Sequence, residues 1–270
     1  MNNKILIDRS KYLRKRIFQS VYEGKGGHIG GSFSVIDILN YLYSEILNFD
    51  PKQPKLDSRD RLILSKGHSC LALYWTLAEF GFFDEELIRS YGYDGSVFAG
   101  HPEYNKGSGI EISSGSLGHG PAIGVGIAQA LKLKKISGRV FVIVGDGESN
   151  EGSVWEAAMS AAQLKLDNFY IIVDNNGMES LDRTDNIMSI EPIDKKFDAF
   201  GFDVVRANGH DFEEIHKSFQ NLNTLNGKPK CFISDTVKAY GLSFTQGVTK
   251  WHYRSPNESE YELGLKELSK

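Results

Sequence analysis

Two short apolar runs, at residues 140–144 and 169–173, constrain the fold of this chain more than any other feature. Both are rich in β-branched or aromatic residues, which is typical of strands buried on both faces of a parallel sheet. Between them, residues 153–166 carry apolar side chains at helical spacing. Two parallel strands need a crossover of this length, so the stretch predicts a strand, a helix and a second parallel strand.

Polar residues follow each run directly. The first is followed by Gly145-Asp146-Gly147-Glu148, and the second by Asp174-Asn175-Asn176. Either motif alone would be an ordinary turn or loop. Together they stand where open α/β sheets bind ligands, at the carboxyl ends of neighbouring strands. Carboxylate and amide oxygens suit a hard divalent cation, and Gly147 lets a backbone N–H approach a phosphate closely, so we predict a diphosphate and metal site.

Composition narrows the class of protein. With 270 residues, 40% of them hydrophobic, the chain can bury a large core, and its alternating strand and helix patterns predict one domain over residues 1–270. We expect a doubly wound α/β fold, with a mostly parallel sheet and helices on both faces. A net charge of −4 gives no electrostatic basis for binding nucleic acid.

The sequence has no feature that indicates membrane insertion or export. No run approaches the roughly 18 apolar residues of a membrane span, and the first residues lack the apolar core of a signal peptide. Cys70 and Cys231 stand far apart, in no metal-binding or redox pattern. We therefore expect reduced, non-catalytic thiols in a cytoplasmic protein.

Four histidines stand in distinctive settings. His28 lies in a glycine-rich stretch before a helix expected at residues 35–47, and His68 stands between a strand at 60–64 and a helix at 70–80. A helix N-terminus favours an anion, although His68 could simply cap its helix, and a histidine in a glycine-rich loop is most often a turn residue. His101 lies in a loop rich in Gly and Tyr, and His252 follows Trp251.

A further glycine-rich loop, at residues 115–120, precedes a helix expected at 122–132. It contains no G-x-G-x-x-G and does not follow a strand, which disfavours a dinucleotide site.

Five motifs, in the same order along nearly the whole chain, resemble the transketolase-like thiamine diphosphate enzymes. They are the stretch around His28, the Lys66-Gly67-His68 turn, the 115–120 loop, the Gly-Asp-Gly and Asn pair, and Trp251-His252. The resemblance implies that Mg²⁺ or Ca²⁺ is held by Asp146, Asn176 and the backbone oxygen of Met178. It implies cofactor contacts from His68, Gly115, Ser116, Leu117, Asp146, Gly147, Glu148, Asn176 and His252. It implies a catalytic substrate channel lined by His28, His68, His101 and His252.

Three further positions have roles that the resemblance leaves open. His119 stands where classical transketolases usually have Gln, so its role stays open. Tyr253 and Arg254 follow His252, where the family usually continues with Gly, which puts the surroundings of His252 and substrate choice in question. Glu151 matches a residue that helps to link two active sites across a subunit interface in the family, or is an exposed carboxylate at a helix start.

The resemblance is to the N-terminal, pyrophosphate-binding subunit of split transketolases. In the family, a Glu of a separate pyrimidine-binding domain activates the thiazolium, and residues 253–270 are too few to form that domain. We therefore expect a C-terminal pyrimidine-binding partner subunit, an α2β2 heterotetramer, and transfer of a two-carbon ketol unit from a ketose to an aldose. The sequence does not distinguish sugar, sugar-phosphate and nucleotide-linked substrates.

Two alternatives remain open at this point. The chain could serve another thiamine diphosphate enzyme, either as the α subunit of a 2-oxoacid dehydrogenase or as a protein resembling deoxyxylulose phosphate synthase. It could also be a non-catalytic paralogue that binds the cofactor weakly.

Overall fold

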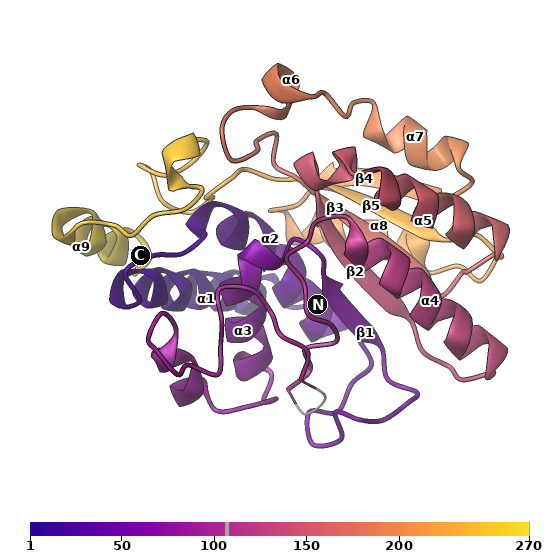
Figure 1. Ribbon diagram of the computed structural model, residues 1–270, viewed down its shortest axis with the longest axis horizontal. Helices are drawn as coiled ribbons and strands as arrows, with labels where there is room; N and C mark the ends of the chain where they lie inside the picture. Colours follow the sequence, from indigo (N-terminus) through magenta and orange to yellow (C-terminus); the bar gives the residue numbers. More distant parts are fainter. Residues whose placement is uncertain (106–107, 270) are drawn as a thin grey trace.

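A parallel sheet forms the centre of the molecule (Figure 1). The computed structural model describes residues 1–105 and 108–269, and within them the sheet has five strands in the order β1-β2-β3-β5-β4. The strands are β1 (Arg61–Leu64), β2 (Val140–Gly145), β3 (Phe169–Asn175), β4 (Asp203–Asn208) and β5 (Lys230–Asp235). Each neighbouring pair is parallel, which confirms the predicted α/β fold.

Helices cover both faces of this sheet. The longer ones are α1 (Asn3–Glu23), α2 (Ile29–Tyr41), α3 (Cys70–Glu79), α4 (His119–Leu133), α5 (Gly152–Gln163), α7 (Ile193–Ala199), α8 (Phe212–Leu222) and α9 (Glu258–Glu267). The shorter ones are η1 (Leu42–Ile46), η2 (Gly67–Ser69), η3 (Glu85–Ser90), η4 (Gly147–Asn150), α6 (Thr184–Ile187) and η5 (Thr249–Trp251).

Alternate residues of each strand point to opposite layers, as the pleat of a strand requires. Phe141 and Ile143 of β2 pack with α1, α2, α3 and α8, whereas Val142 and Val144 pack with α4, α5 and α7. Figure 1 shows α4, α5 and α7 together on one side of the sheet. Both faces are therefore buried, which explains why the strand sequences are apolar throughout.

The strand register brings the expected site motifs together. Gly145 of β2 lies beside Asp174 of β3, and Asp174 lies beside Ser234 of β5. The residues that follow these three strands therefore emerge side by side at one edge of the sheet.

Helix α2 differs from its predicted bounds. It begins at Ile29, so Gly30 and Gly31, which we expected in a loop, lie in its first turn. A Cβ atom at Gly30 would lie 2.8 Å from Cε of Lys238, and one at Gly31 would lie 2.5 Å from Oγ of Ser69. These glycines therefore serve close packing of a helix.

Helix α9 was not predicted. Its N-terminus has a capping box, in which the Asn257 side chain accepts a hydrogen bond from the Glu260 N–H and the Glu260 side chain accepts one from the Asn257 N–H. An Asn-x-x-Glu pair satisfies free N–H groups at a helix start. This spacing is present in the sequence and could have predicted the start of α9.

A buried ionic network joins α1, α2 and the turn before α8. Arg14 donates to both carboxylate oxygens of Asp37, at 3.0 and 2.5 Å. Nε2 of His210 accepts from the Val237 N–H at 2.9 Å, so Nδ1 carries the proton that is donated to Asp37 at 2.7 Å. Burial alone would raise the pKa of Asp37, but Arg14 and His210 lower it to about 2.

We predict that Asp37→Ala lowers the free energy of unfolding by about 3–5 kcal/mol, because it leaves the buried Arg14 charge unpaired. Urea unfolding followed by circular dichroism measures this change. Because the folded pKa lies below the ordinary value of 3.8, the contribution is complete above pH 3.8 and is lost as the pH falls toward 2. The difference in the free energy of unfolding between the parent and Asp37→Ala should therefore shrink as the pH falls from 3.8 toward 2.

The matched control is Glu86→Ala, which removes an exposed ion pair with Arg89 on η3. Exposed pairs contribute little, so this variant should lose no more than about 0.5 kcal/mol. Equal losses in the two variants would contradict the role assigned to the buried network.

Candidate functional site

The carboxyl edge of the sheet carries a cavity of about 420 Å³. It is lined by residues that follow β1, β2, β3 and β5. Eight of the predicted site residues are in its lining: His68, Leu117, Asp146, Gly147, Glu148, Asn176, Met178 and His252. His28, His101, Gly115 and Ser116 are outside it within the described part of the chain, but a Cβ atom at Gly115 would lie 2.8 Å from the His101 ring.

Asp146 is a buried carboxylate whose hydrogen bonds are all to the backbone in the part of the chain described. Its oxygens accept from the N–H of Gly147 at 2.9 Å and of Gly177 at 2.6 Å. Burial, and then the charge of Asp174, raise the pKa of Asp146 to about 7. A divalent cation beside this carboxylate would compensate its charge.

Asn176 and Met178 lie next to Asp146 on the loop that follows β3. The side-chain oxygen of Asn176 accepts from the Met178 N–H at 3.2 Å. No group of three or more His, Cys, Asp or Glu side chains is positioned to hold a metal ion anywhere in residues 1–105 and 108–269. A metal here would therefore rest on fewer than three such side chains, with neutral oxygens completing the set, as in sites that leave positions for substrate phosphates.

Two buried lysines complete the floor of the cavity, and sequence analysis did not identify either as functional. Lys66 forms an ion pair with Asp174, which also accepts from the hydroxyls of Ser34 at 2.6 Å and Thr236 at 2.5 Å. Burial would raise the pKa of Asp174, but Lys66 and these hydrogen bonds lower it. The only sequence signal for Lys66 was its place beside Gly67-His68.

Lys238 reaches the cavity from the segment after β5. Its Nζ donates to the Glu179 carbonyl at 2.6 Å and lies 3.0 Å from Nδ1 of His252 and 3.5 Å from the Met178 carbonyl. Burial, followed by repulsion from Lys66, lowers its pKa to about 8. No local motif marks Lys238, because its position depends on how the chain returns over α2.

Glu148 holds the 115–120 loop against the sheet. Its carboxylate accepts from the Ser65 hydroxyl, from the Gly118 N–H at 2.9 Å and from the Gly145 N–H at 3.0 Å. Burial raises its pKa. Glu148 thus reaches the cavity, and its visible contacts are those of a structural anchor.

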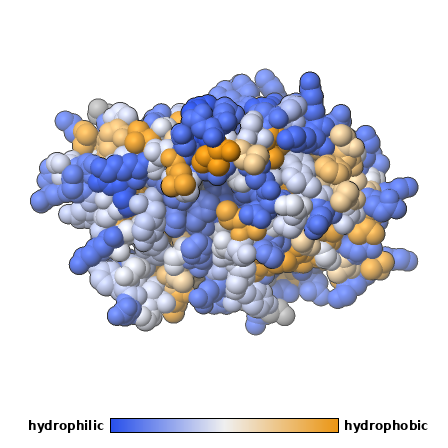
Figure 2. Space-filling view, turned by 45° about the horizontal axis from the view of Figure 1, so that its top comes forward, coloured by the Kyte–Doolittle hydropathy of each residue, from blue (hydrophilic) through white to orange (hydrophobic). Residues whose placement is uncertain are grey.

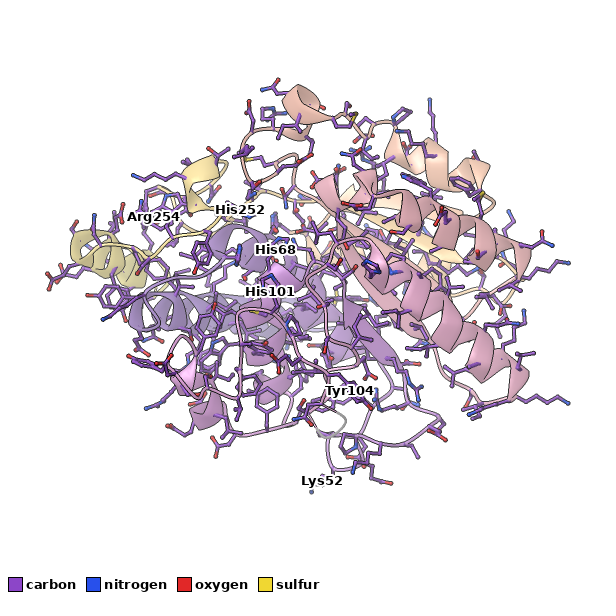
Figure 3. The ribbon with its side chains drawn as sticks, viewed as in Figure 1. Lys52, His68, His101, Tyr104, His252 and Arg254 are labelled. Carbon is purple, nitrogen blue, oxygen red and sulfur yellow. The ribbon has the colours of Figure 1, made fainter. Side chains whose placement is uncertain are left out.

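Four imidazoles gather at this edge, with His28 at their centre. Its ring centroid lies 5.2 Å from those of His68 and His252 and 6.1 Å from that of His101. Figure 3 shows His68, His101 and His252 approaching from three segments. Burial lowers the pKa of His28 to about 4, helped by His101, and that of His252 to about 3, helped by Lys238. Both rings are therefore neutral near pH 7.

The residues present fit a bound diphosphate with its metal. Two buried ammonium groups, those of Lys66 and Lys238, line the cavity beside neutral oxygens and four acidic residues, Asp146, Glu148, Glu151 and Glu179. The buried hydroxyls of Ser32 and Ser69 and Nδ1 of His28 have no hydrogen-bond partner among the residues that the structure describes. These three residues are not in the cavity lining, so the fit rests on the ammonium groups and oxygens that are.

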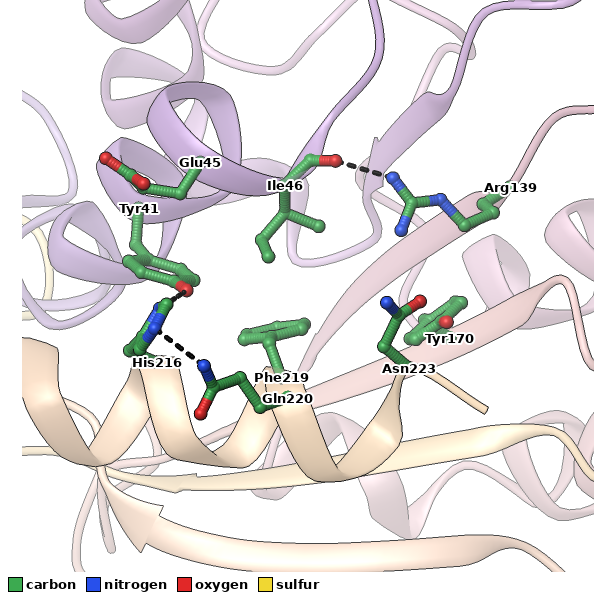
Figure 4. Close-up of a pocket in the computed structure, with 9 residues that line it drawn as sticks. All are labelled: Tyr41, Glu45, Ile46, Arg139, Tyr170, His216, Phe219, Gln220 and Asn223. Carbon is green, nitrogen blue, oxygen red and sulfur yellow. Dashed lines mark hydrogen bonds between the residues drawn. The ribbon is translucent and has the colours of Figure 1, made fainter. Parts of the chain in front are cut away.

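A second cavity, of about 240 Å³, lies beside Arg139, just before β2, at the opposite edge of the sheet (Figure 4). Its polar groups bond to one another and to the backbone. The Tyr41 hydroxyl lies 2.9 Å from His216, which lies 3.0 Å from Gln220, and Arg139 donates to the Ile46 carbonyl and to Asp60. These contacts agree with a structural role for His216.

The surface is mostly hydrophilic, with apolar side chains interrupting the face seen in Figure 2. The loop over the cavity contributes exposed Leu181, Ile187 and Met188. None of the helices in the described residues is both long enough and apolar enough to cross a membrane.

Comparison with known proteins identifies the family. Residues 8–266 match the family model described as "Transketolase, thiamine diphosphate binding domain". The chain is 41% identical to an apulose-4-phosphate transketolase subunit of Phocaeicola vulgatus, covering 97% of this chain and 92% of the relative. It is 35% identical to a 6-deoxy-6-sulfo-D-fructose transketolase subunit, SqwG, of Clostridium sp., covering 97% and 95%.

A solved structure agrees with these matches. Transketolase of Campylobacter jejuni superposes with a TM-score of 0.93 at 32% identity, covering all of this chain and 43% of that longer chain. This chain thus spans less than half of the Campylobacter jejuni chain and nearly all of the relatives named as subunits. The chain belongs to the transketolase family, in which it corresponds to the N-terminal, thiamine diphosphate-binding part.

Proposed function

We propose that this chain is the thiamine diphosphate- and metal-binding subunit of a two-chain transketolase. Its reaction is transfer of a two-carbon ketol unit from a ketose to an aldose. One observation carries the proposal: a single cavity combines the Asp146 carboxylate, the buried ammonium groups of Lys66 and Lys238, and the imidazoles of His68 and His252. This set matches the charges of a diphosphate, its metal and an oxygen-rich substrate.

The metal end of the cofactor belongs beside Asp146. Its carboxylate, the Asn176 side-chain oxygen and the Met178 carbonyl would hold Mg²⁺ or Ca²⁺, since both ions take oxygen ligands. Lys238 would face the diphosphate, with further contacts from His68, His252, Gly147 and the 115–117 loop. The bound cofactor supplies a ring that stabilises negative charge on the transferred carbon unit.

The imidazoles would handle protons of the sugar. His28 and His252 are neutral near pH 7. The Lys238 ammonium lies 3.0 Å from Nδ1 of His252, which leaves the proton of that ring on Nε2, so His252 would donate to a sugar oxygen, whereas His28 would accept from a hydroxyl group. The His101 ring lies edge-on to that of His28, so it would line the same channel.

A partner chain would supply the group that activates the cofactor ring. Support comes from the relatives that are named as transketolase subunits and from the share of single-chain transketolase that this chain spans. We propose that residues 1–270 act as one domain, and that two copies assemble with two pyrimidine-binding chains into an α2β2 heterotetramer in the cytoplasm.

The first test is calorimetric titration of thiamine diphosphate with Mg²⁺ into this chain, alone and mixed with a pyrimidine-binding chain encoded by a neighbouring gene. We expect tighter binding in the mixture, and ketol transfer only there, because the activating group is in the partner. Absence of binding in both samples would overturn the enzymatic proposal in favour of a non-catalytic one.

Asp146→Ala should abolish metal-dependent binding of thiamine diphosphate, because it removes the one carboxylate proposed as a metal ligand. Calorimetry with and without Mg²⁺ measures this, and circular dichroism should show an intact fold. The control is Asp8→Ala, at an exposed position on α1, which should bind as the parent does. Parent-like binding by Asp146→Ala would mean that the metal site is wrongly assigned.

His252→Ala should lower kcat about 100-fold or more, as expected for loss of a proton-transferring group, while thiamine diphosphate affinity changes much less. Steady-state kinetics of the mixed enzyme and calorimetry separate the two effects. The control His216→Ala alters a histidine at the opposite edge of the sheet and should retain kcat. A loss of affinity as large as the loss of kcat would instead make His252 chiefly a cofactor-binding residue.

A further inference from the structure

We infer that Tyr253 determines which sugars this enzyme accepts, because its ring lies over His28 and limits how far a substrate can extend past the imidazoles. The inference rests on the proposed ketol transfer and names a specificity residue for it. It favours short aldoses over long ones as acceptors.

The position of the ring is the first support. The centroids of Tyr253 and His28 lie 4.6 Å apart with the rings tilted by 56°, so the tyrosine ring is nearer to His28 than the other three imidazoles are. Tyr253 is 60% exposed. A large aromatic residue thus covers a proposed catalytic ring on one side and faces open space on the other.

The backbone beneath Tyr253 is made of glycine. A Cβ atom at Gly26 would lie 3.0 Å from the Tyr253 hydroxyl oxygen and 3.4 Å from Cζ. The aromatic ring can rest against the chain here because Gly26 has no side chain. The ring therefore occupies the space between Gly26 and His28.

The segment around Tyr253 is fixed on both sides. The Arg254 N–H donates to the Gly27 carbonyl at 3.3 Å, and the Arg254 guanidinium lies 4.2 Å from the centre of the buried Trp251 ring. The same guanidinium donates to Glu260 at 2.6 Å, and Glu260 belongs to the capping box of α9. These contacts hold the backbone that carries the Tyr253 ring, and the ring itself rests against Gly26.

A fixed wall at this place discriminates by length. The substrate must bring its reacting carbonyl to His28 and His252, so any carbon chain that extends on the Tyr253 side meets the aromatic ring. Hydrophobic walls of this kind distinguish substrates by about 10- to 200-fold in kcat/KM. A short aldose avoids the contact, whereas a longer one must bend away from it.

The test uses the enzyme mixed with its pyrimidine-binding partner, hydroxypyruvate as a common donor, and glyceraldehyde or ribose as acceptor. Tyr253→Ala should raise the ratio of kcat/KM for ribose to that for glyceraldehyde by about 10-fold, because removal of the wall helps only the longer sugar. Tyr253→Phe should keep the parent ratio, since it retains the ring. Tyr12→Ala, at an exposed tyrosine on α1, is the control and should also keep it.

A second measurement needs no turnover. Diethyl pyrocarbonate modifies accessible neutral imidazoles, and peptide mass spectrometry reports the rate at each histidine of the isolated chain. Tyr253→Ala should speed modification of His28 severalfold and leave that of His119 unchanged, whereas Tyr253→Phe should behave as the parent.

The outcomes separate the two proposals. If the parent mixture transfers the ketol unit but Tyr253→Ala leaves the ribose to glyceraldehyde ratio unchanged, the specificity role of Tyr253 is overturned and the proposed function stands. If neither acceptor reacts in the parent mixture and thiamine diphosphate does not bind, the proposed function is overturned and the specificity role with it. An unchanged rate at His28 would show that Tyr253 does not cover it.

Discussion

The ion pair between Lys66 and Asp174 is the interaction on which the carboxyl edge depends. Lys66 follows β1 and precedes the Gly67-His68 turn, whereas Asp174 lies near the end of β3 and precedes Asn176. A buried pair is costly to desolvate unless its other hydrogen-bonding groups are satisfied. The hydroxyls of Ser34 and Thr236 provide that satisfaction from α2 and the segment after β5. The end of β1, α2, β3 and the segment after β5 thus meet at the Asp174 carboxylate. This contact holds the Gly67-His68 turn at a set distance from the loop that carries Asn176.

The charges that remain around this pair explain why the cavity suits a diphosphate with its metal. Lys66 forms an ion pair with Asp174, so the Asp146 carboxyl group and the Lys238 amino group remain beside the cavity. The pKa of Asp146 is raised to about 7 and that of Lys238 is lowered to about 8, each chiefly by burial. Both charged forms are thus held at a cost in the chain alone. A divalent cation on one side and phosphate oxygens on the other would offset both costs together, which a neutral ligand would not.

Sequence reasoning located the strands around residues 140–144 and 169–173, and the positions of Asp146 and Asn176, for a definite physical reason. Parallel strands bring their carboxyl ends to one edge, so Asp146 and Asn176 were placed together without any knowledge of packing. Lys238 could not be found in this way. It lies beside His252 because the segment that follows β5 packs across α2, and no local motif shows this packing. The start of α2 at Ile29 was missed for a similar reason: glycine disfavours an isolated helix, and only the packing of Gly30 and Gly31 against Lys238 and Ser69 shows why they stand there.

The molecule separates the part that would bind the cofactor from the part that would choose the substrate. Asp146, Lys66 and Lys238 are each nearly inaccessible and lie just after strands of the sheet. Substitution of any one of them would leave a neighbouring buried charge without compensation, which is costly. Tyr253 is exposed, and its segment is fixed by Arg254 and the cap of α9, which lies apart from the sheet. A change at Tyr253 would therefore alter the proposed channel wall without disturbing a buried charge.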